Sequence, residues 1–311
     1  MQPHFSIIIP HYNIPDLLMR CLKSIPVSED IQVIVVDDNS PNADTYLEKY
    51  PELSRPYLEF IRENKHGGAG YARNLALPFV KGEKVLFADA DDLFVDDISS
   101  ILDEYGDDDA DLIYFNAQGR FSDNLSLISN RNRDKLFEEY ERDGNINIFR
   151  YQCVEPWGKI FTRRLIYYNN IRFDETSVSN DYMFSMKTGI YAKKIKVVNR
   201  PIYLATVRKD SLSYKVIDTK RKLLDRFYVQ ARVQVFLQEH GYCKDEMLIF
   251  DLVVNMCHRY PLLFISKLFW LRKLGINVRK LLWMIITKRV FSPSKRRHFD
   301  INKVHYKKIG L

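Results

Sequence analysis

The chain has 311 residues, of which 46% are apolar and 28% charged, and this composition excludes an intrinsically disordered chain because it supplies enough apolar surface for a core. The formal net charge is +7. The four cysteines form no C-x-x-C pair, which argues against a zinc site or a disulfide framework and favours buried thiols in a reducing compartment.

The excess positive charge lies at the C-terminal end. Between Pro261 and Leu311 there are 13 Lys or Arg residues and one acidic residue, Asp300, so the first 260 residues are net negative. Positive charge confined to one end indicates an anionic partner for that end, and anionic lipid and nucleic acid are the usual candidates.

The first part of the chain alternates between strand and helix patterns. Residues 5–9 and 31–36 are short, nearly continuous apolar runs, typical of strands covered on both faces, and apolar residues at helical spacing lie between them, over 15–25. The next predicted elements are strands at 58–62, 84–88 and 111–115 and a helix at 69–80. This order predicts an α/β fold with a mostly parallel sheet, in which ligands bind beyond the carboxyl ends of the strands.

The later part is less regular and then becomes helical. Residues 120–150 are polar and weakly patterned, which indicates loops, edge strands and one short helix. From about residue 217 the apolar residues follow helical spacing, so we place a boundary near residue 215. No basic leader or cleavage site precedes the first strand, so we expect no secretory signal.

An acidic cluster follows the predicted strand at 84–88. Asp89, Asp91 and Asp92 would repel one another at the end of a buried strand unless a cation compensated them. A hard divalent ion, Mg²⁺ or Mn²⁺, prefers such oxygen ligands and keeps open positions for substrate phosphates. The alternative is a solvated acidic turn or a helix N-cap.

Two further polar segments follow strands. The run from Asp37 to Pro41 offers carboxylates that can accept from a ribose hydroxyl or a base N–H, although the same residue types also form ordinary turns. The glycine-rich segment from Asn64 to Asn74 lets the backbone approach a phosphate-bearing ligand, and Arg73 lies one helical turn inside it.

With these elements in this order, the chain resembles family 2 glycosyltransferases of the GT-A fold from Phe5 to about Ser213. The matching motifs are Ile9 to Asn13, Val36 to Ser40, Gly68 to Asn74, Phe87 to Asp92, Trp157 to Phe161 and Asn180 to Phe184. The resemblance implies a Rossmann-like, mostly parallel sheet flanked by helices, with a C-terminal helical, basic extension. The implied catalytic domain is 1–215, with a nucleotide-binding half at about 1–115 and an acceptor half at about 116–215, and the helical region is 216–311.

The resemblance implies an inverting, metal-dependent transfer of a sugar from a nucleotide-sugar donor, with UDP as the expected nucleotide, to an acceptor hydroxyl in cell-surface polysaccharide, capsule or lipopolysaccharide assembly. The acceptor would be lipid-linked or a saccharide. The implied nucleotide-binding residues are Pro10, Tyr12, Asp38, Arg73 and Asp89. Asp91, with Asp89 or Asp92 beside it, would bind the divalent cation and the diphosphate.

The remaining implied residues concern the acceptor and the catalytic base. Asp181 matches the base that takes the proton from the attacking hydroxyl, and Asn180 stands where the family usually has Glu, which removes a neighbouring like charge. Trp157 and Lys159 match positions that shape the acceptor side, with core packing as the alternative. Arg208 resembles the basic residue of a closing loop that meets the diphosphate, with a solvated turn as the alternative.

The basic C-terminal region contains apolar segments that are too short to span a bilayer. Apolar residues from Val278 to Ile286 share one helical face bordered by basic residues, which favours an in-plane helix on an anionic membrane surface. We therefore expect the anionic partner to be a membrane and not a nucleic acid. We therefore expect a cytoplasmic protein that is peripheral on the inner membrane. The alternative is a helical cap packed on the catalytic domain.

Two other functions stay open on the sequence. One is a catalytically inactive GT-A-like binding subunit, which Asn180 favours. The other is a different α/β nucleotide-dependent enzyme, but Gly68-x-Gly70-x-x-Arg73 lacks the third glycine of a dinucleotide fingerprint and does not follow the first strand. Leu93 stands where a D-x-D-x-T phosphatase motif requires Thr.

Overall fold

The computed structural model describes residues 2–208, 219–242 and 248–291, with side chains through Thr287. The chain forms two compact units. The first contains residues Met1–Thr176 and Phe184–Val216, and the second contains Ser177–Met183 and Ile217–Leu311. Cys21, Cys153 and Cys257 are free thiols, and Cys243 lies outside the described residues.

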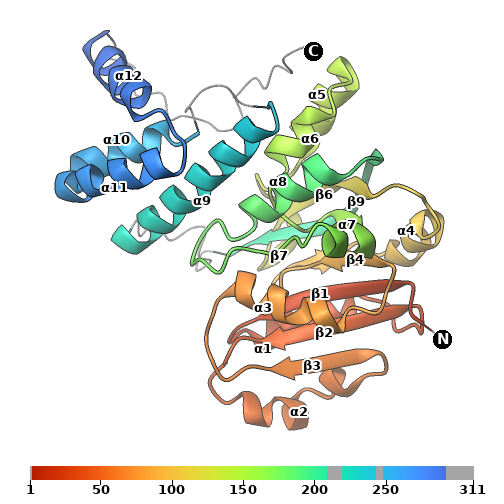
Figure 1. The fold of residues 1–311 in the computed structure, drawn as a ribbon. Coiled ribbons are helices and arrows are strands. Elements are labelled where there is room, and N and C mark those ends of the chain that lie inside the picture. The colour runs from red at the N-terminus through yellow and green to blue at the C-terminus, as the bar shows by residue number, and fades with distance from the viewer. Residues whose placement is uncertain (1, 209–218, 243–247, 292–311) are drawn as a thin grey trace. The chain divides into compact units, whose positions relative to one another are not determined.

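The first unit is built on one mixed sheet with the strand order β3-β2-β1-β4-β8-β6-β9-β5, and β7 pairs with β6 (Figure 1). The strands are β1 (Phe5–His11), β2 (Ile31–Asp37), β3 (Leu58–Arg62), β4 (Lys84–Phe87), β5 (Leu93–Phe94), β6 (Leu112–Phe121), β7 (Asn124–Ile128), β8 (Lys159–Thr162) and β9 (Ile195–Val207). The strands β3, β2, β1 and β4 are parallel, and β8 runs antiparallel to both β4 and β6. The predicted α/β fold class is confirmed.

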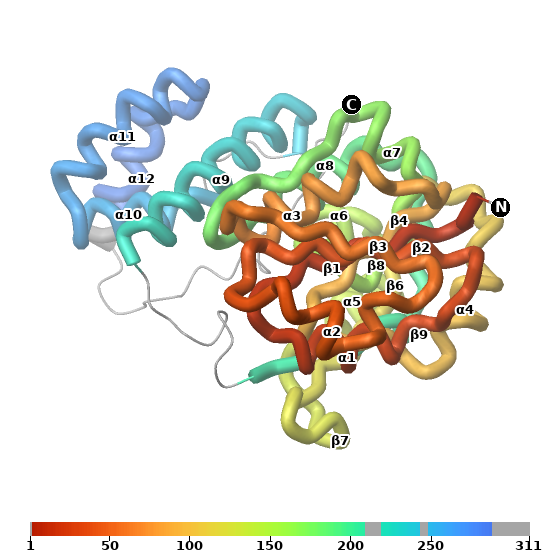
Figure 2. Tube along the Cα trace, turned by 90° about the horizontal axis from the view of Figure 1, so that it is seen from below, coloured from red at the N-terminus to blue at the C-terminus, as the bar shows by residue number. Residues whose placement is uncertain are grey.

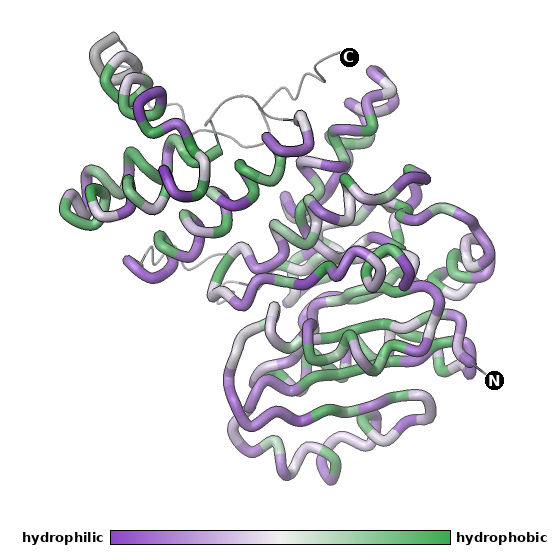
Figure 3. The backbone as a smooth tube through the Cα atoms, viewed as in Figure 1, coloured by the Kyte–Doolittle hydropathy of each residue, from purple (hydrophilic) through white to green (hydrophobic). Residues whose placement is uncertain are grey.

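Helices cover both faces of this sheet, and β1 and β2 are therefore buried along their whole length. Alternate side chains point to opposite faces. Ile7 packs in one core cluster with Leu22 of α1 (Pro15–Lys23), whereas Ile8 packs in the other with Ala76 of α3 (Ala69–Ala76). The hydropathy colouring of Figure 3 shows β1 and β2 as continuous apolar stretches, which the predicted double-sided burial requires.

The other helices of this unit are short. They are η1 (Ala43–Thr45), α2 (Tyr46–Lys49), η2 (Pro51–Ser54), η3 (Leu77–Phe79), α4 (Ile98–Tyr105), α5 (Asp134–Asp143), α6 (Asn147–Gln152), α7 (Arg163–Tyr168) and α8 (Tyr182–Tyr191). The region 120–150 is more regular than its sequence pattern suggested. β6 continues to Phe121 because it pairs with β9 over ten residues, and β7 extends beyond the sheet as a hairpin arm (Figure 2).

The second unit is helical, as the sequence predicted for this region. Its helices are α9 (Lys220–Glu239), α10 (Phe250–Arg259), α11 (Pro261–Lys273) and α12 (Val278–Phe291). Phe227 of α9, Val253 of α10, and Leu271 and Leu281 share one apolar core. Among the described residues, no helix combines the length and the apolar character needed to cross a membrane.

The apolar face predicted between Val278 and Ile286 has a different partner from the one expected. Leu281 and Ile285 are buried in the core of the second unit, and Leu282 packs against it. Only Ile286 of the predicted face is exposed, beside Trp283. Most of the face assigned to a membrane therefore packs against protein. The basic residues from 292 onward lie outside the described residues.

Candidate functional site

The carboxyl ends of β1, β2 and β4 bring together the residues predicted to bind the nucleotide and the metal. The strands β1 and β2 are in parallel register, with Pro10 opposite Val36 and His11 opposite Asp37. The loops that begin with Tyr12 and Asp38 therefore leave the sheet side by side. The acidic cluster follows β4 on the other side of β1.

A buried network joins the ends of β1 and β2. His11 Nδ1 lies 2.8 Å from Asp37 Oδ1, and His11 Nε2 accepts from the Ile14 N–H at 3.1 Å. Because Nε2 accepts, Nδ1 carries the ring proton and donates to Asp37. Ser40 donates its hydroxyl to Asp37 Oδ1 at 2.5 Å and its N–H to Oδ2 at 2.9 Å. The sequence pattern by itself does not reveal this network.

This network controls the charge of Asp37. Burial alone would raise the pKa of Asp37, but the hydrogen bonds from His11 and Ser40 outweigh burial and hold the pKa below its ordinary value. The carboxylate is therefore ionised and has no exposed surface. It fixes the loop that follows each strand, since Ser40 Oγ also accepts from the Asn13 N–H at 2.7 Å.

Asp38 anchors the glycine-rich segment. Its Oδ1 accepts from the Gly67 N–H at 2.7 Å and its Oδ2 from the Gly68 N–H at 2.8 Å. His66 Nδ1 lies 2.8 Å from the same Oδ2. Tyr12 is 45% exposed, and its ring centroid lies 4.4 Å from that of His66. The two rings make an aromatic surface beside a buried carboxylate, a combination suited to a nucleoside.

Arg73 is buried and binds the first residue of the acidic cluster. Its guanidinium lies 2.6 Å from Asp89 Oδ1 and 5.2 Å from the centroid of the Phe173 ring. The Asp89 N–H donates to the Tyr203 hydroxyl at 2.8 Å. Arg73 and Asp89, both predicted to bind the nucleotide, are thus in direct contact with each other.

The next two acidic residues differ in access to solvent. Asp91 is partly exposed, and its Oδ2 lies 3.1 Å from Nη2 of Arg208. Asp92 is fully buried, and its Oδ1 accepts from the Thr206 N–H at 2.6 Å. Burial raises the pKa of Asp91, as does Asp89, and burial together with the charges of Asp91 and Asp89 raises the pKa of Asp92 well above its ordinary value.

The cluster has the donor set of a hard cation. Among the described residues, Asp92 Oδ2 is a buried oxygen without a hydrogen-bond partner. Carboxylate oxygens with raised pKa values gain most from a nearby positive charge. The described residues contain no group of three or more His, Cys, Asp or Glu side chains already placed around one point. Assignment of Asp91 and Asp92 as metal ligands stays a prediction.

The residues predicted to shape the acceptor side are buried. Trp157 stacks on Tyr203, with ring centroids 5.2 Å apart and an interplanar angle of 12°. Lys159 donates from Nζ to the Cys153 carbonyl at 2.6 Å and lies 5.2 Å from the Tyr114 ring centroid. This burial matches the core-packing alternative, and the acceptor role of both residues stays a prediction.

Asp181 lies directly before α8, in the segment Ser177–Met183 that belongs to the second unit. Within that unit, Ser177 donates its N–H to Oδ2 of Asp225 on α9 at 3.0 Å. The role of Asp181 as a base stays a prediction. Of the loop predicted to close over the donor, Arg208 is described, and residues 209–213 lie outside the described residues.

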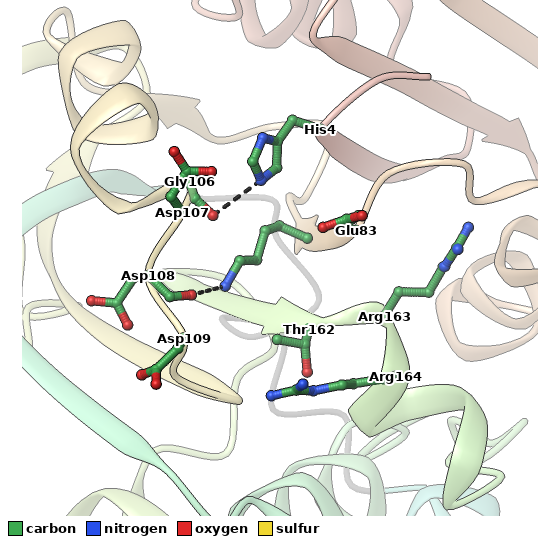
Figure 4. A pocket seen from close by; sticks show the side chains of 10 residues that line it. His4, Glu83, Gly106, Asp107, Asp108, Asp109, Thr162, Arg163 and Arg164 are labelled. Atoms are coloured by element: carbon green, nitrogen blue, oxygen red, sulfur yellow. Dashed lines mark hydrogen bonds between the residues drawn. The ribbon is translucent and has the colours of Figure 1, made fainter. Parts of the chain in front are cut away.

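A cavity of about 410 Å³ lies at the opposite edge of the sheet, near the amino ends of β1 and β4 (Figure 4). His4 precedes β1, and its ring lies 3.0 Å from the Gly106 carbonyl. Lys84 begins β4 and donates to the Asp108 carbonyl. None of the predicted site residues lines this cavity, so it is separate from the site at the carboxyl edge.

Comparison with known proteins identifies relatives of this chain. The model of the family described as glycosyl transferase family 2 matches residues 6–172. "Glycosyltransferase GlyA" of Streptococcus pneumoniae is 27% identical over 231 residues, which cover 67% of this chain and 31% of that protein. The "poly(ribitol-phosphate) beta-glucosyltransferase" of Bacillus spizizenii is 30% identical over 219 residues, which cover 66% of this chain and 32% of that protein. The chain thus spans about a third of the length of these relatives.

The fold is shared with a solved structure, S. aureus TarS 1–349 in complex with UDP-GlcNAc. The TM-score is 0.60 at 24% identity, and the match covers 82% of this chain and 73% of that chain. This likeness supports the GT-A fold and the topology that places Asp38 and Asp91 at one edge of the sheet.

Proposed function

The chain belongs to glycosyl transferase family 2, and on this premise we propose that it transfers a sugar from a nucleotide-sugar donor to an acceptor hydroxyl. One observation carries the proposal. Tyr12, Asp38 and the Asp89 to Asp92 cluster follow adjacent parallel strands, β1, β2 and β4, at their carboxyl ends. In open α/β sheets this edge is where ligands bind.

The nucleoside binds beside Tyr12 in this proposal. Its base packs on the exposed Tyr12 ring, and Asp38 accepts a hydrogen bond from the base or ribose with the Oδ1 lone pair that Gly67 leaves available, because Gly68 and His66 already occupy Oδ2. Pro10 lies opposite Val36, and the next residue, His11, ends the register with β2 just before Tyr12, so the two residues fix where the Tyr12 ring leaves the sheet. UDP is the proposed nucleotide, supported by the complex of the TarS structure with UDP-GlcNAc.

Asp91, with Asp89 and Asp92 beside it, would hold Mg²⁺ or Mn²⁺. When bound, the cation would neutralise negative charge on the departing diphosphate. Two arginines of this chain contact the acidic cluster. Arg73 holds Asp89 in place, and Arg208 pairs with Asp91. A cation that took the place of Arg208 at Asp91 would release Arg208 to contact the diphosphate.

The proposed reaction inverts the anomeric centre. The acceptor oxygen forms a bond to the anomeric carbon, the bond from that carbon to the diphosphate oxygen breaks, and the hydroxyl proton passes to the Asp181 carboxylate. No general acid is needed because the diphosphate leaves as an anion. Asn180, in place of an acid, leaves the Asp181 carboxylate without a like charge next to it in sequence.

The proposed acceptor is a lipid-linked or saccharide component of a bacterial cell-surface polymer. The name of one sequence relative, the poly(ribitol-phosphate) beta-glucosyltransferase of Bacillus spizizenii, supports this class. We place the reaction at the cytoplasmic face of the membrane, where a nucleotide-sugar donor and a lipid-linked acceptor would meet.

A donor-hydrolysis screen tests this function, because slow hydrolysis of a nucleotide sugar needs no acceptor. We expect the full chain to release nucleoside diphosphate from one UDP- or GDP-sugar when Mn²⁺ or Mg²⁺ is present. A chelator and the substitution Asp91→Ala should both abolish the release. The control Asp107→Ala removes an exposed carboxylate at the opposite edge of the sheet and should leave the rate unchanged.

Three results would contradict parts of the proposal. Hydrolysis that persists with chelator would exclude the metal role of Asp91. Donor binding by calorimetry without hydrolysis or transfer would favour the inactive binding subunit. Equal rates for Asp181→Asn and the unsubstituted chain in transfer to an acceptor extract would exclude Asp181 as the base.

A further inference from the structure

The helix α11 presents large apolar side chains on the side that faces away from its own core. Leu262, Ile265 and Phe269 are 82%, 61% and 65% exposed. Their spacing of three and four residues puts them on one face of the helix. The opposite side contributes Leu271 to the core of the second unit, with Trp270 packed against it. Both sides of α11 are therefore apolar, and one of them has no described protein contact that covers it.

The chain from α11 through most of α12 carries charge of one sign. Residues 261–287 contain five Lys or Arg residues and no Asp or Glu. The exposed face of α11 ends in Arg272 and Lys273, and the Lys273 ammonium lies 4.8 Å from the Phe269 ring centroid. The apolar stripe is thus bordered by cations at its C-terminal end. Such a combination matches a surface that is apolar inside and anionic outside.

We propose that the exposed face of α11, defined by Leu262, Ile265 and Phe269, docks in the plane of an anionic lipid bilayer. The three side chains enter the boundary between headgroups and acyl chains, and Arg272 and Lys273 contact the lipid phosphates. A second copy of the chain fits this face less well. In a two-fold contact through this face, α11 of neither copy offers an acid to pair with Arg272 and Lys273 of the other.

The membrane-docking surface that we propose lies on α11, whereas the sequence pattern indicated α12. The apolar periodicity of α12 is used inside the second unit by Leu281 and Ile285. Among the side chains of α12 that the structure describes, which end at Thr287, the exposed large apolar residues are Trp283 and Ile286. The proposal adds a location to the proposed function and is independent of the donor chemistry, so lipid binding and sugar transfer can fail separately.

Vesicle cosedimentation of the full chain tests the docking surface. The vesicles contain phosphatidylcholine alone or phosphatidylcholine mixed with phosphatidylglycerol. We expect binding to the anionic vesicles that weakens with added salt, and weak binding to the neutral vesicles. The triple substitution Leu262→Ser, Ile265→Ser and Phe269→Ser should reduce the partition coefficient for anionic vesicles by about tenfold or more.

A matched control removes exposed apolar residues elsewhere. Leu127→Ser with Ile128→Ser changes two exposed residues of β7 and should leave vesicle binding unchanged. A thermal melt of each variant shows whether the second unit is still folded. Unchanged binding by a folded triple variant would overturn the proposal, and so would equal binding of the unsubstituted chain to neutral and anionic vesicles. A dimer in light scattering that the triple substitution abolishes, without vesicle binding, would assign the face to a second copy.

Discussion

We expect His11→Phe to lower the free energy of unfolding of the sheet-bearing unit by about 2–4.5 kcal/mol. Phenylalanine keeps an aromatic ring but removes two hydrogen bonds in a fully buried place. The bond that His11 donates to the Asp37 carboxylate accounts for about 1.5–3 kcal/mol, and the bond accepted from the Ile14 N–H for about 0.5–1.5 kcal/mol.

Two further substitutions at His11 separate these contributions. Asparagine places an amide N–H near the position of Nδ1, so His11→Asn keeps a donor for Asp37 and loses only the acceptor for Ile14. Glutamine reaches the position of Nε2, so His11→Gln keeps that acceptor and loses the donor. The loss of stability should therefore rank Phe above Gln and Gln above Asn.

Urea unfolding at neutral pH, followed by fluorescence and circular dichroism, measures the three losses. The affinity for UDP should fall in the same order, because the network fixes the loops that carry Tyr12 and Asp38. Equal stability of the Phe and Asn variants would refute the reasoning, since it would mean that the hydrogen bond to Asp37 contributes nothing measurable.

Two other substitutions test the same unit. A Cβ at residue 82 would lie 2.5 Å from the Phe5 carbonyl carbon and 2.6 Å from the Ser6 nitrogen, both backbone atoms, so Gly82→Ala should cost about 1–3 kcal/mol in urea unfolding; a neutral effect would show that β1 can move. The pKa of Asp37 is lowered from 3.8, so its stabilising effect is present above that value and is lost as the pH falls below it. The stability difference between the unsubstituted chain and Asp37→Asn should therefore be largest at neutral pH and shrink below about pH 4, and a constant difference would contradict the lowered pKa.

The sequence predicted the parallel half of the sheet well because local pattern and burial agree there. The runs at 5–9 and 31–36 are continuous and rich in β-branched residues, and they form β1 and β2. The strands β5 and β8, which pair antiparallel with their neighbours, were not predicted. Lys159 and Thr162 give β8 a polar appearance, and β5 has only two residues, so both depend on pairing with strands distant in sequence.

In the site, too, the sequence predicted what local pattern determines and missed what contacts between distant segments determine. The sequence placed Asp38 and the glycine-rich segment near one ligand, but the bond from Asp38 to the Gly67 and Gly68 amides depends on how β2 and α3 are packed. The contact between His11 and Asp37 could in principle have been predicted from the sequence, because a parallel register that ends both strands together puts the two residues opposite each other. An amphipathic pattern such as that of α12 reveals an apolar face and leaves open whether protein or lipid covers it.

The anchoring of the glycine-rich segment by Asp38 also decides which anions the sheet edge can receive. Amide groups at the start of a helix attract phosphate in dinucleotide-binding folds. Here the two amides ahead of α3 are occupied by a carboxylate, whose negative charge repels a phosphate approaching along the helix axis. A pyrophosphate bound as we propose would therefore be neutralised by side chains and a cation on the β4 side. Inhibitors that imitate a nicotinamide dinucleotide should therefore bind poorly at the start of α3.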